Sequence, residues 1–133
     1  MSKYVVMLED DSDDHSLVKD TLLELSISIP VKFFSSSQAL FSFLAGAKEQ
    51  PSLILADHNA VPDNGIAVLR KLKSQPSLAG IPVVILSDSD LAVYREEAYR
   101  LGAASFIKKP DTIQATGEKI GLFFRYWLEV AEV

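Results

Sequence analysis

The chain alternates between two apolar patterns, and this alternation limits the folds open to it. Short apolar runs rich in β-branched residues fall at residues 4–8, 31–34, 53–56, 82–86 and 104–107. Continuous runs of this kind are typical of strands that are buried on both faces of a sheet. The segments between them carry apolar residues at helical spacing. One such stripe is Leu17, Val18, Thr21, Leu22 and Leu25, and another is Leu91, Tyr94, Ala98 and Leu101.

Strand and helix patterns follow each other along the whole chain without a break in composition. This order predicts an α/β fold, a parallel sheet with helices on both faces and right-handed crossovers. Five strands favour a doubly wound sheet in the order 2-1-3-4-5. A length of 133 residues fits a single domain, which we expect to span residues 1–133.

Composition excludes several classes of protein. The net charge of −5 disfavours nucleic acid as a partner, because phosphate binding needs a basic surface. With no cysteine, neither a disulfide framework nor a thiolate metal site is possible. The first residues do not form a signal peptide, and no apolar run approaches the roughly 20 residues that span a bilayer. We therefore expect a cytoplasmic protein that does not bind membranes.

Reactive side chains follow the predicted strands. Glu9-Asp10-Asp11 follow the first strand, Asp57 the third, Ser87 the fourth, and Lys108-Lys109 the fifth. The carboxyl ends of parallel strands meet at one edge of a sheet, which is where ligands bind. Adjacent carboxylates repel one another, and a hard cation such as Mg²⁺ relieves that repulsion. We expect Glu9 and Asp10 to serve such a cation, and Asp11 to be a turn residue.

Asp57 is the candidate nucleophile, because an aspartate carboxylate beside a cation site can accept a phosphoryl group. The Ser87 hydroxyl could donate a hydrogen bond to a phosphoryl oxygen, although a role as a helix cap is equally open. One lysine of the pair could place its ammonium nearby, and Pro110 favours Lys109. His15 and His58 do not form a metal-ligand spacing, so we expect both on the surface.

At this point the chain resembles the receiver domains of two-component response regulators, which have a flavodoxin-like (βα)5 fold. The matching positions occur in the right order at the ends of the predicted strands: Glu9-Asp10, Asp57, Asn59, Gly65, Ser87 and Lys109-Pro110. Each is common alone, but the whole set in this rhythm is specific. The chain is identified on these positions as a member of that family.

The resemblance implies a role for each matching position. Asp57 would accept the phosphoryl group from a phosphohistidine of a sensor histidine kinase, in a phosphorelay. Asp10 and Asp57 would bind Mg²⁺ directly, Glu9 through water, and Asn59 through its backbone carbonyl. Ser87 and Lys109 would contact the phosphoryl group. Phe106 would be the aromatic switch, whose rotamer follows phosphorylation.

Three positions depart from the family pattern. The proline that usually stands four residues after the acceptor is Val61 here, and Pro62 follows it. Phe106 lacks the hydroxyl of a switch tyrosine, so any switching must act through packing. Ser87 keeps the hydroxyl of the more common threonine and loses its methyl group.

The last helical segment is unusually apolar, with Phe123, Phe124, Tyr126, Trp127 and Leu128. It is similar to the tail of stand-alone receivers that serve bacterial phytochrome kinases, and we expect no output domain after it. We therefore expect a stand-alone regulator whose partner is a sensor kinase, of the phytochrome type, or a phosphotransfer protein. A homodimer through the last helix and a helix that wraps its own domain are both open.

Other functions have the same strand order. An aspartyl-phosphate phosphatase would need an acid at position 59, where Asn59 stands, so we expect no enzyme beyond slow self-dephosphorylation. A flavodoxin-like nucleotide binder would need a donor-rich loop where Glu9-Asp10-Asp11 stand. A receiver-like module that is never phosphorylated is the remaining alternative.

Overall fold

The computed structural model describes residues 4–9, 12–24, 26, 28–59, 63–89, 91–108, 119 and 121–127. Strands and helices alternate in the predicted order. The strands are β1 (Val5–Leu8), β2 (Val31–Phe34), β3 (Leu53–Asp57), β4 (Val83–Ser87) and β5 (Ser105–Lys108). The helices are α1 (Ser12–Glu24), α2 (Ser37–Gly46), α3 (Gly65–Lys73) and α4 (Ala92–Arg100). Residues 119 and 121–125 are also helical, within the predicted last helix.

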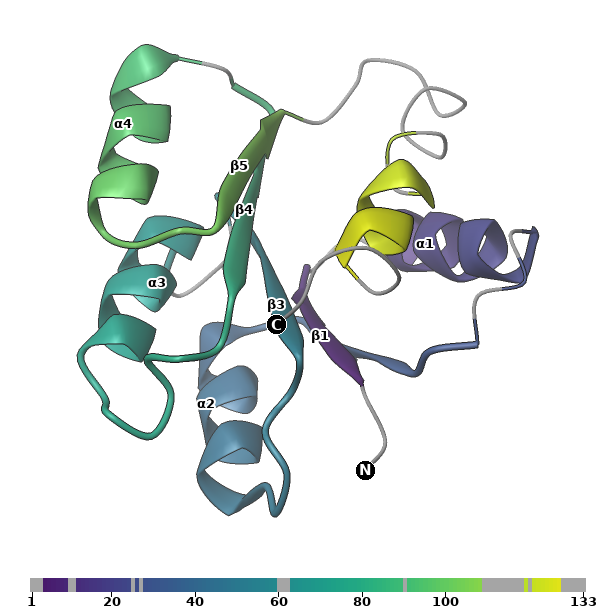
Figure 1. Ribbon diagram of the computed structural model, residues 1–133, viewed down its shortest axis with the longest axis horizontal. Helices are drawn as coiled ribbons and strands as arrows, with labels where there is room; N and C mark the ends of the chain where they lie inside the picture. Colours follow the sequence, from purple (N-terminus) through teal and green to yellow (C-terminus); the bar gives the residue numbers. More distant parts are fainter. Residues whose placement is uncertain are drawn as a thin grey trace.

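The strands form one parallel sheet in the order β2-β1-β3-β4-β5, as the sequence predicts. Helices α2, α3 and α4 lie on one side of it, and α1 lies on the other side together with the helical segment 121–125 (Figure 1). The doubly wound α/β prediction is therefore confirmed. This arrangement brings the carboxyl ends of all strands to one edge, where the predicted site lies.

Side chains of the central strands alternate between the two faces, as the pleat of a strand requires. In β1, Val6 and Leu8 join the cluster under α2 and α3, whereas Val5 and Met7 join the cluster under α1. Every residue of β1 and β3 is buried, as predicted. The edge strands β2 and β5 are mostly half-buried, so the prediction of burial on both faces is wrong for them. They lie at the sheet margins, where helices cover less of each face.

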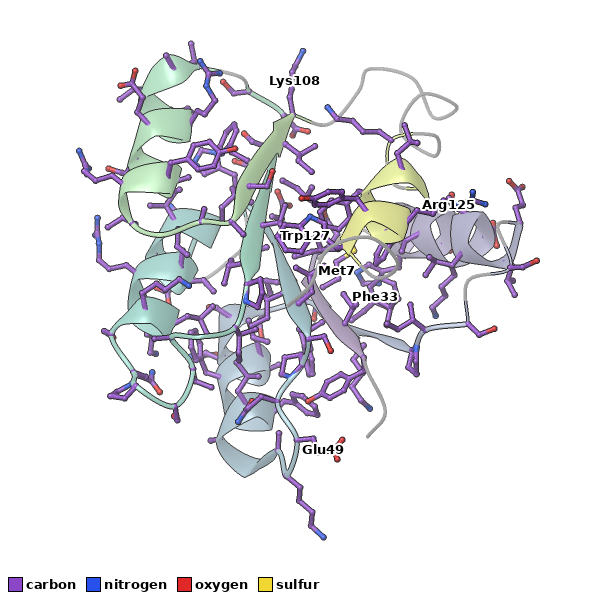
Figure 2. The ribbon with its side chains drawn as sticks, viewed as in Figure 1. Met7, Phe33, Glu49, Lys108, Arg125 and Trp127 are labelled. Carbon is purple, nitrogen blue, oxygen red and sulfur yellow. The ribbon has the colours of Figure 1, made fainter. Side chains whose placement is uncertain are left out.

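The cluster on the α1 side includes a residue from the far end of the sequence. Phe124 is 1% exposed and packs with Val18 and Leu22 of α1 and with the central strands. Figure 2 shows Met7, Phe33 and Trp127 on this side of the sheet. The last helical segment therefore covers its own sheet with one stripe.

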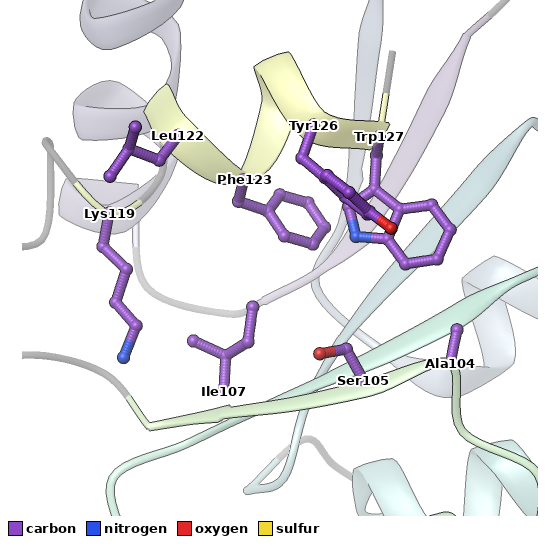
Figure 3. A pocket seen from close by; sticks show the side chains of 8 residues that line it. All are labelled: Ala104, Ser105, Ile107, Lys119, Leu122, Phe123, Tyr126 and Trp127. Atoms are coloured by element: carbon purple, nitrogen blue, oxygen red, sulfur yellow. The ribbon is translucent and has the colours of Figure 1, made fainter. Parts of the chain in front are cut away.

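A groove of about 470 Å³ runs between β5 and this segment. Ser105 and Ile107 form its floor, and Phe123 and Trp127 overhang it from the helix (Figure 3). Leu122 and Tyr126 also line it and are 72% and 53% exposed. The segment thus keeps apolar side chains outside the core.

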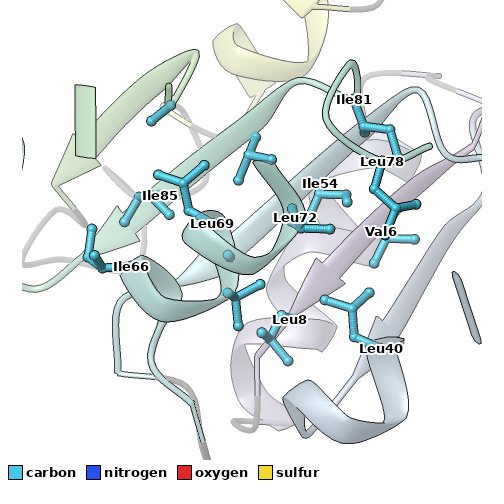
Figure 4. Packing of buried hydrophobic residues seen from close by; sticks show 14 of the residues in the cluster. Val6, Leu8, Leu40, Ile54, Ile66, Leu69, Leu72, Leu78, Ile81 and Ile85 are labelled. Carbon is cyan, nitrogen blue, oxygen red and sulfur yellow. The ribbon is translucent and has the colours of Figure 1, made fainter. Parts of the chain in front are cut away.

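The cluster on the opposite face is larger and brings together β1, β3 and β4 with α2 and α3 (Figure 4). Helix α3 contributes Ile66, Val68, Leu69 and Leu72, all at most 5% exposed. This packing fixes the position of α3, whose first turn follows the loop after Asp57.

Helix α4 is covered less than its apolar stripe predicts. Only Ala98 is buried, while Leu91 is 55% exposed and Tyr94 is 36% exposed. Leu91 is the N-cap of α4 rather than a residue of its buried face. The helix therefore buries one small side chain and leaves larger ones exposed.

Local signals place several helix ends as predicted. The Ser36 side chain caps α2 by accepting a hydrogen bond from the Ala39 backbone N–H at 3.2 Å. Gly102 follows α4 with φ +101°, a left-handed conformation that favours glycine. Among the described helices, none combines the length and the apolar character that crossing a membrane requires.

Candidate functional site

Three polar side chains meet at the carboxyl edge of the central strands. Leu8 pairs with Ala56 across β1 and β3, so the next residues, Glu9 and Asp57, follow neighbouring positions of the sheet. Asp57 pairs with Leu86 of β4, and Ser87 follows it. The residues Glu9, Asp57 and Ser87 are 2%, 5% and 0% exposed. The structure thus brings together three of the predicted site residues.

The Asp57 carboxylate is oriented by the turn that follows it. The backbone N–H of Asn59 donates a hydrogen bond to Asp57 Oδ1 at 3.1 Å. This Asx turn is a local bond between the side chain and the chain two residues later. It fixes one carboxylate oxygen and restricts the rotation of the other.

Gly65 allows helix α3 to approach the backbone of Asp57. A Cβ atom at this position would lie 2.7 Å from the Asp57 carbonyl oxygen, closer than van der Waals contact permits. The Gly65 N–H also donates to the His58 carbonyl at 3.2 Å. The glycine that the sequence singles out therefore serves a close backbone approach, without a positive φ.

Ser87 contacts the turn after Asp57. Its Oγ accepts a hydrogen bond from the Ser89 backbone N–H at 3.1 Å and lies 3.3 Å from His58 Nδ1. Ser89 in turn contacts the start of the α4 region, because its Oγ accepts from the Leu91 N–H. Ser87 thus takes part in the turn after β4, and Leu91 rather than Ser87 is the N-cap of α4.

The two loops are joined by a second side-chain bond. Asn59 Nδ2 donates to Asp88 Oδ2 at 3.4 Å. The Asn59 side chain is therefore turned towards the β4 loop, and its backbone N–H towards Asp57. Both described bonds of Asn59 therefore use its N–H groups as donors.

Glu9 is held at the end of β1 by the neighbouring strand and by α1. Its backbone N–H donates to the Phe34 carbonyl at 3.0 Å, and its carbonyl oxygen lies 2.5 Å from His15 Nε2. The His15 ring stacks on Phe33 with ring centroids 4.3 Å apart. His15 and His58 are both half-buried beside the site, so the expectation that they are surface residues is wrong.

The residues at this edge suit a divalent cation. Two nearly buried carboxylates on neighbouring strand ends repel each other, and hard cations prefer carboxylate, carbonyl and water oxygens. Within the described part of the chain, no group of three or more His, Cys, Asp and Glu is close enough to hold a metal. The third predicted acid, Asp10, lies outside the described residues, as do Lys109 and the Val61-Pro62 positions.

The predicted switch residue Phe106 lies on β5, and its side chain is half-buried. Its backbone N–H donates to the Tyr99 hydroxyl of α4 at 3.1 Å. The end of β5 is reached by Lys119, whose Nζ donates to the Lys108 carbonyl at 2.7 Å. Through its bond to Tyr99, Phe106 lies next to α4, whose residues are mostly exposed.

The response regulator receiver domain family matches residues 5–120. The chain belongs to this family. The match covers all the strands and the residues at their carboxyl ends, including Asp57 and Ser87.

Relatives and solved structures place this receiver more narrowly. The response regulator Rcp1 of Synechocystis sp. strain PCC 6803 is 27% identical over 132 residues, 96% of this chain and 90% of that protein. The crystal structure of phosphorylated RcpA, a cyanobacterial phytochrome response regulator, superposes with a TM-score of 0.91 at 26% identity, covering 99% and 98% of the two chains. The Mn²⁺-bound form of Rcp1 gives a TM-score of 0.90 at 26% identity, covering 98% of each. This receiver is thus homologous to Rcp1 and RcpA.

The sequence did not indicate the roles of His58, Asp88 and Tyr94. His58 contacts Ser87, Asp88 binds Asn59, and the Tyr94 ring packs on His58 with centroids 4.6 Å apart. The two side-chain bonds join loops that are 29 residues apart, and no local sequence pattern indicates them. The only signal in the sequence was the position of His58 directly after Asp57.

Proposed function

We propose that this receiver accepts a phosphoryl group on Asp57 from a phosphohistidine of a sensor histidine kinase. The observation that carries the proposal is the oriented, 5% exposed Asp57 carboxylate between the strand ends that hold Glu9 and Ser87. A carboxylate oxygen attacks phosphorus and forms the new O–P bond. The N–P bond of the phosphohistidine breaks, and the imidazole nitrogen keeps the electron pair.

Mg²⁺ is the cation that we propose for the site, held by Glu9, Asp10, Asp57 and the Asn59 carbonyl. When bound, it would offset the charge between the carboxylate and the incoming phosphoryl group. The support from this chain is the burial of Glu9 and Asp57 on adjacent strand ends. The Mn²⁺-bound form of Rcp1 shows that a relative takes a divalent cation.

Three further residues complete the proposed phosphoryl site. The Ser87 hydroxyl donates to a phosphoryl oxygen, and the Lys109 ammonium supplies a compensating charge. Phe106 has no hydroxyl and would respond to phosphorylation through packing. Its backbone N–H is bonded to the Tyr99 hydroxyl, which connects it to α4. Through these three residues, phosphorylation of Asp57 would change the conformation of α4 and β5.

A phytochrome-type sensor kinase is the partner that we propose, because RcpA is a phytochrome response regulator. The protein would act by docking on other proteins as a single cytoplasmic domain, without an enzymatic output of its own. A transfer assay with purified kinases, one with a phytochrome sensor and one without, tests the choice. Faster transfer from the kinase that lacks the phytochrome sensor would contradict it.

A homodimer through the last helical segment is a further proposal. The groove beside β5 is lined by Leu122 and Tyr126, both largely exposed, with Trp127 half-buried next to them. Sedimentation of the protein and of Leu122→Asp tests it. A monomer at all concentrations, or a dimer that survives Leu122→Asp, would contradict a dimer through this surface.

Intact-mass measurement tests phosphorylation directly. The protein is incubated with Mg²⁺ and acetyl phosphate, and we expect one phosphoryl adduct that is absent from Asp57→Asn and absent when EDTA removes the cation. An adduct that persists in Asp57→Asn places the acceptor elsewhere. If no adduct forms in the unchanged protein, the never-phosphorylated alternative gains support.

A further inference from the structure

His58 directly follows the acceptor but has no role in the function proposed above. Its ring is half-buried, with Nδ1 3.3 Å from Ser87 Oγ. The Tyr94 ring of α4 packs on the His58 ring, with centroids 4.6 Å apart and planes at 56°. The ring therefore lies between the Ser87 hydroxyl and helix α4.

The hydrogen bonds of Ser87 indicate the direction of its contact with His58. Ser87 is fully buried, and its hydroxyl has one proton that needs an acceptor. The Ser89 N–H donates to this oxygen and cannot accept. His58 Nδ1 is the other partner that the structure gives, so the hydroxyl proton is donated to that nitrogen.

The backbone of His58 is fixed on both sides, which holds the ring in place. Its N–H donates to the Leu86 carbonyl of β4 at 2.7 Å, and its carbonyl accepts from the Gly65 N–H of α3 at 3.2 Å. Together with the Tyr94 ring, these bonds restrict the movement of the imidazole. The acceptor for the Ser87 proton is thus preorganised.

We propose that His58 is a positioning residue that holds the Ser87 hydroxyl in the resting protein. A phosphoryl group on Asp57 can bind this hydroxyl only if the bond to His58 is broken. One hydrogen bond is exchanged for another, so the His58 contact lowers the affinity of the site for a phosphoryl group. This inference rests on the proposed phosphorylation of Asp57.

The test measures the affinity for beryllofluoride, a phosphoryl mimic, by calorimetry in the presence of Mg²⁺. In His58→Phe, the ring contact with Tyr94 is kept and the acceptor for the Ser87 proton is lost. Release of one neutral hydrogen bond should tighten binding about three- to tenfold. His58→Asn keeps an acceptor at the distance of Nδ1 from the backbone and should restore the affinity of the unchanged protein.

The same change in a Ser87→Ala background shows whether the effect passes through the hydroxyl. There, His58→Phe should leave the affinity unchanged. Tyr4→Phe is the matched control, because it removes a tyrosine hydrogen bond to the Glu49 carbonyl, away from the carboxyl edge. Circular dichroism of each variant confirms that it is folded.

The outcomes separate this inference from the function on which it rests. Equal or weaker binding in His58→Phe, or an equal gain in the Ser87→Ala background, overturns the role of His58 while phosphorylation of Asp57 stands. If the unchanged protein shows neither beryllofluoride binding nor an acetyl phosphate adduct, the proposed function fails and the role of His58 fails with it.

Discussion

Single residues set the geometry around Asp57 through contacts of a few ångströms. Gly65 lets the backbone of α3 approach the Asp57 carbonyl, and Asn59 orients the carboxylate. At the far edge of the sheet, Tyr4 donates to the Glu49 carbonyl.

Gly65→Ala should lower the free energy of unfolding by about 1–3 kcal/mol, because the new Cβ would overlap the Asp57 carbonyl oxygen and force the backbone apart. Urea unfolding measures the change. Gly46→Ala is the matched control, since a Cβ there meets no atom within 4 Å and Gly46 is also helical. Equal effects of the two changes would contradict the overlap.

Tyr4 should make stability fall at alkaline pH. Partial burial, and then the charge of Glu49, raise the pKa of Tyr4 above its ordinary value of 10.0. The folded protein therefore holds the phenol proton more tightly than the unfolded chain, and this contribution is complete below the unfolded pKa and is lost as pH rises through the folded one. Urea unfolding from about pH 9 to pH 11 should show a shallower loss in Tyr4→Phe. An identical slope would contradict the shift.

The sequence predicted the positions of those polar residues that directly follow a predicted strand. Glu9, Asp57 and Ser87 lie at the predicted edge, because a strand end can be located from an apolar run. The contacts of His58 could not be predicted in this way. They depend on the direction of one side chain in a turn and on a partner from another loop.

The N-terminal ends of α3 and α4 show how far the local sequence determines a helix. Asn64 caps α3 by accepting a hydrogen bond from the Ala67 N–H at 2.9 Å, after the loop that follows Asp57. Helix α4 shows the opposite, because Leu91 fits its apolar spacing and yet is exposed at the N-cap. Spacing alone does not show how much of a helix the rest of the fold covers.

Asn64→Ala should lower the free energy of unfolding by about 0.5–2 kcal/mol, since the first turn of α3 loses its side-chain acceptor. Thermal or urea unfolding measures this loss. Asn64→Ser retains an oxygen that can cap the helix and should recover most of it. If both variants lose the same stability, the cap is not the cause.

In the described part of the chain, the sheet lies between two apolar clusters that different helices build. One is built by α2 and α3 with the central strands, and the other by α1 and Phe124. The sheet order and the two layers were predictable, because alternation and the crossover rule leave few topologies. Which side of the last helical segment covers the sheet was not, since its sequence is apolar on more than one side.

Phe124→Ala should lower the free energy of unfolding by about 3–5 kcal/mol, because a fully buried ring is replaced by a cavity in the α1 cluster. Leu122→Ala is the control from the same segment, and its side chain is 72% exposed. Urea unfolding should separate the two by several kcal/mol. A large effect of Leu122→Ala on the monomer would contradict this assignment of faces.

The position of Phe124 has a consequence for synthesis of the chain on the ribosome. Val5 and Met7 are synthesised long before Phe124, the aromatic residue that closes their cluster. One face of the nascent sheet therefore stays open to solvent until Phe124 has been synthesised. Ribosome stalling before Phe124 should leave a chain that binds chaperones and resists folding, whereas emergence of the segment with Phe124 lets the domain fold.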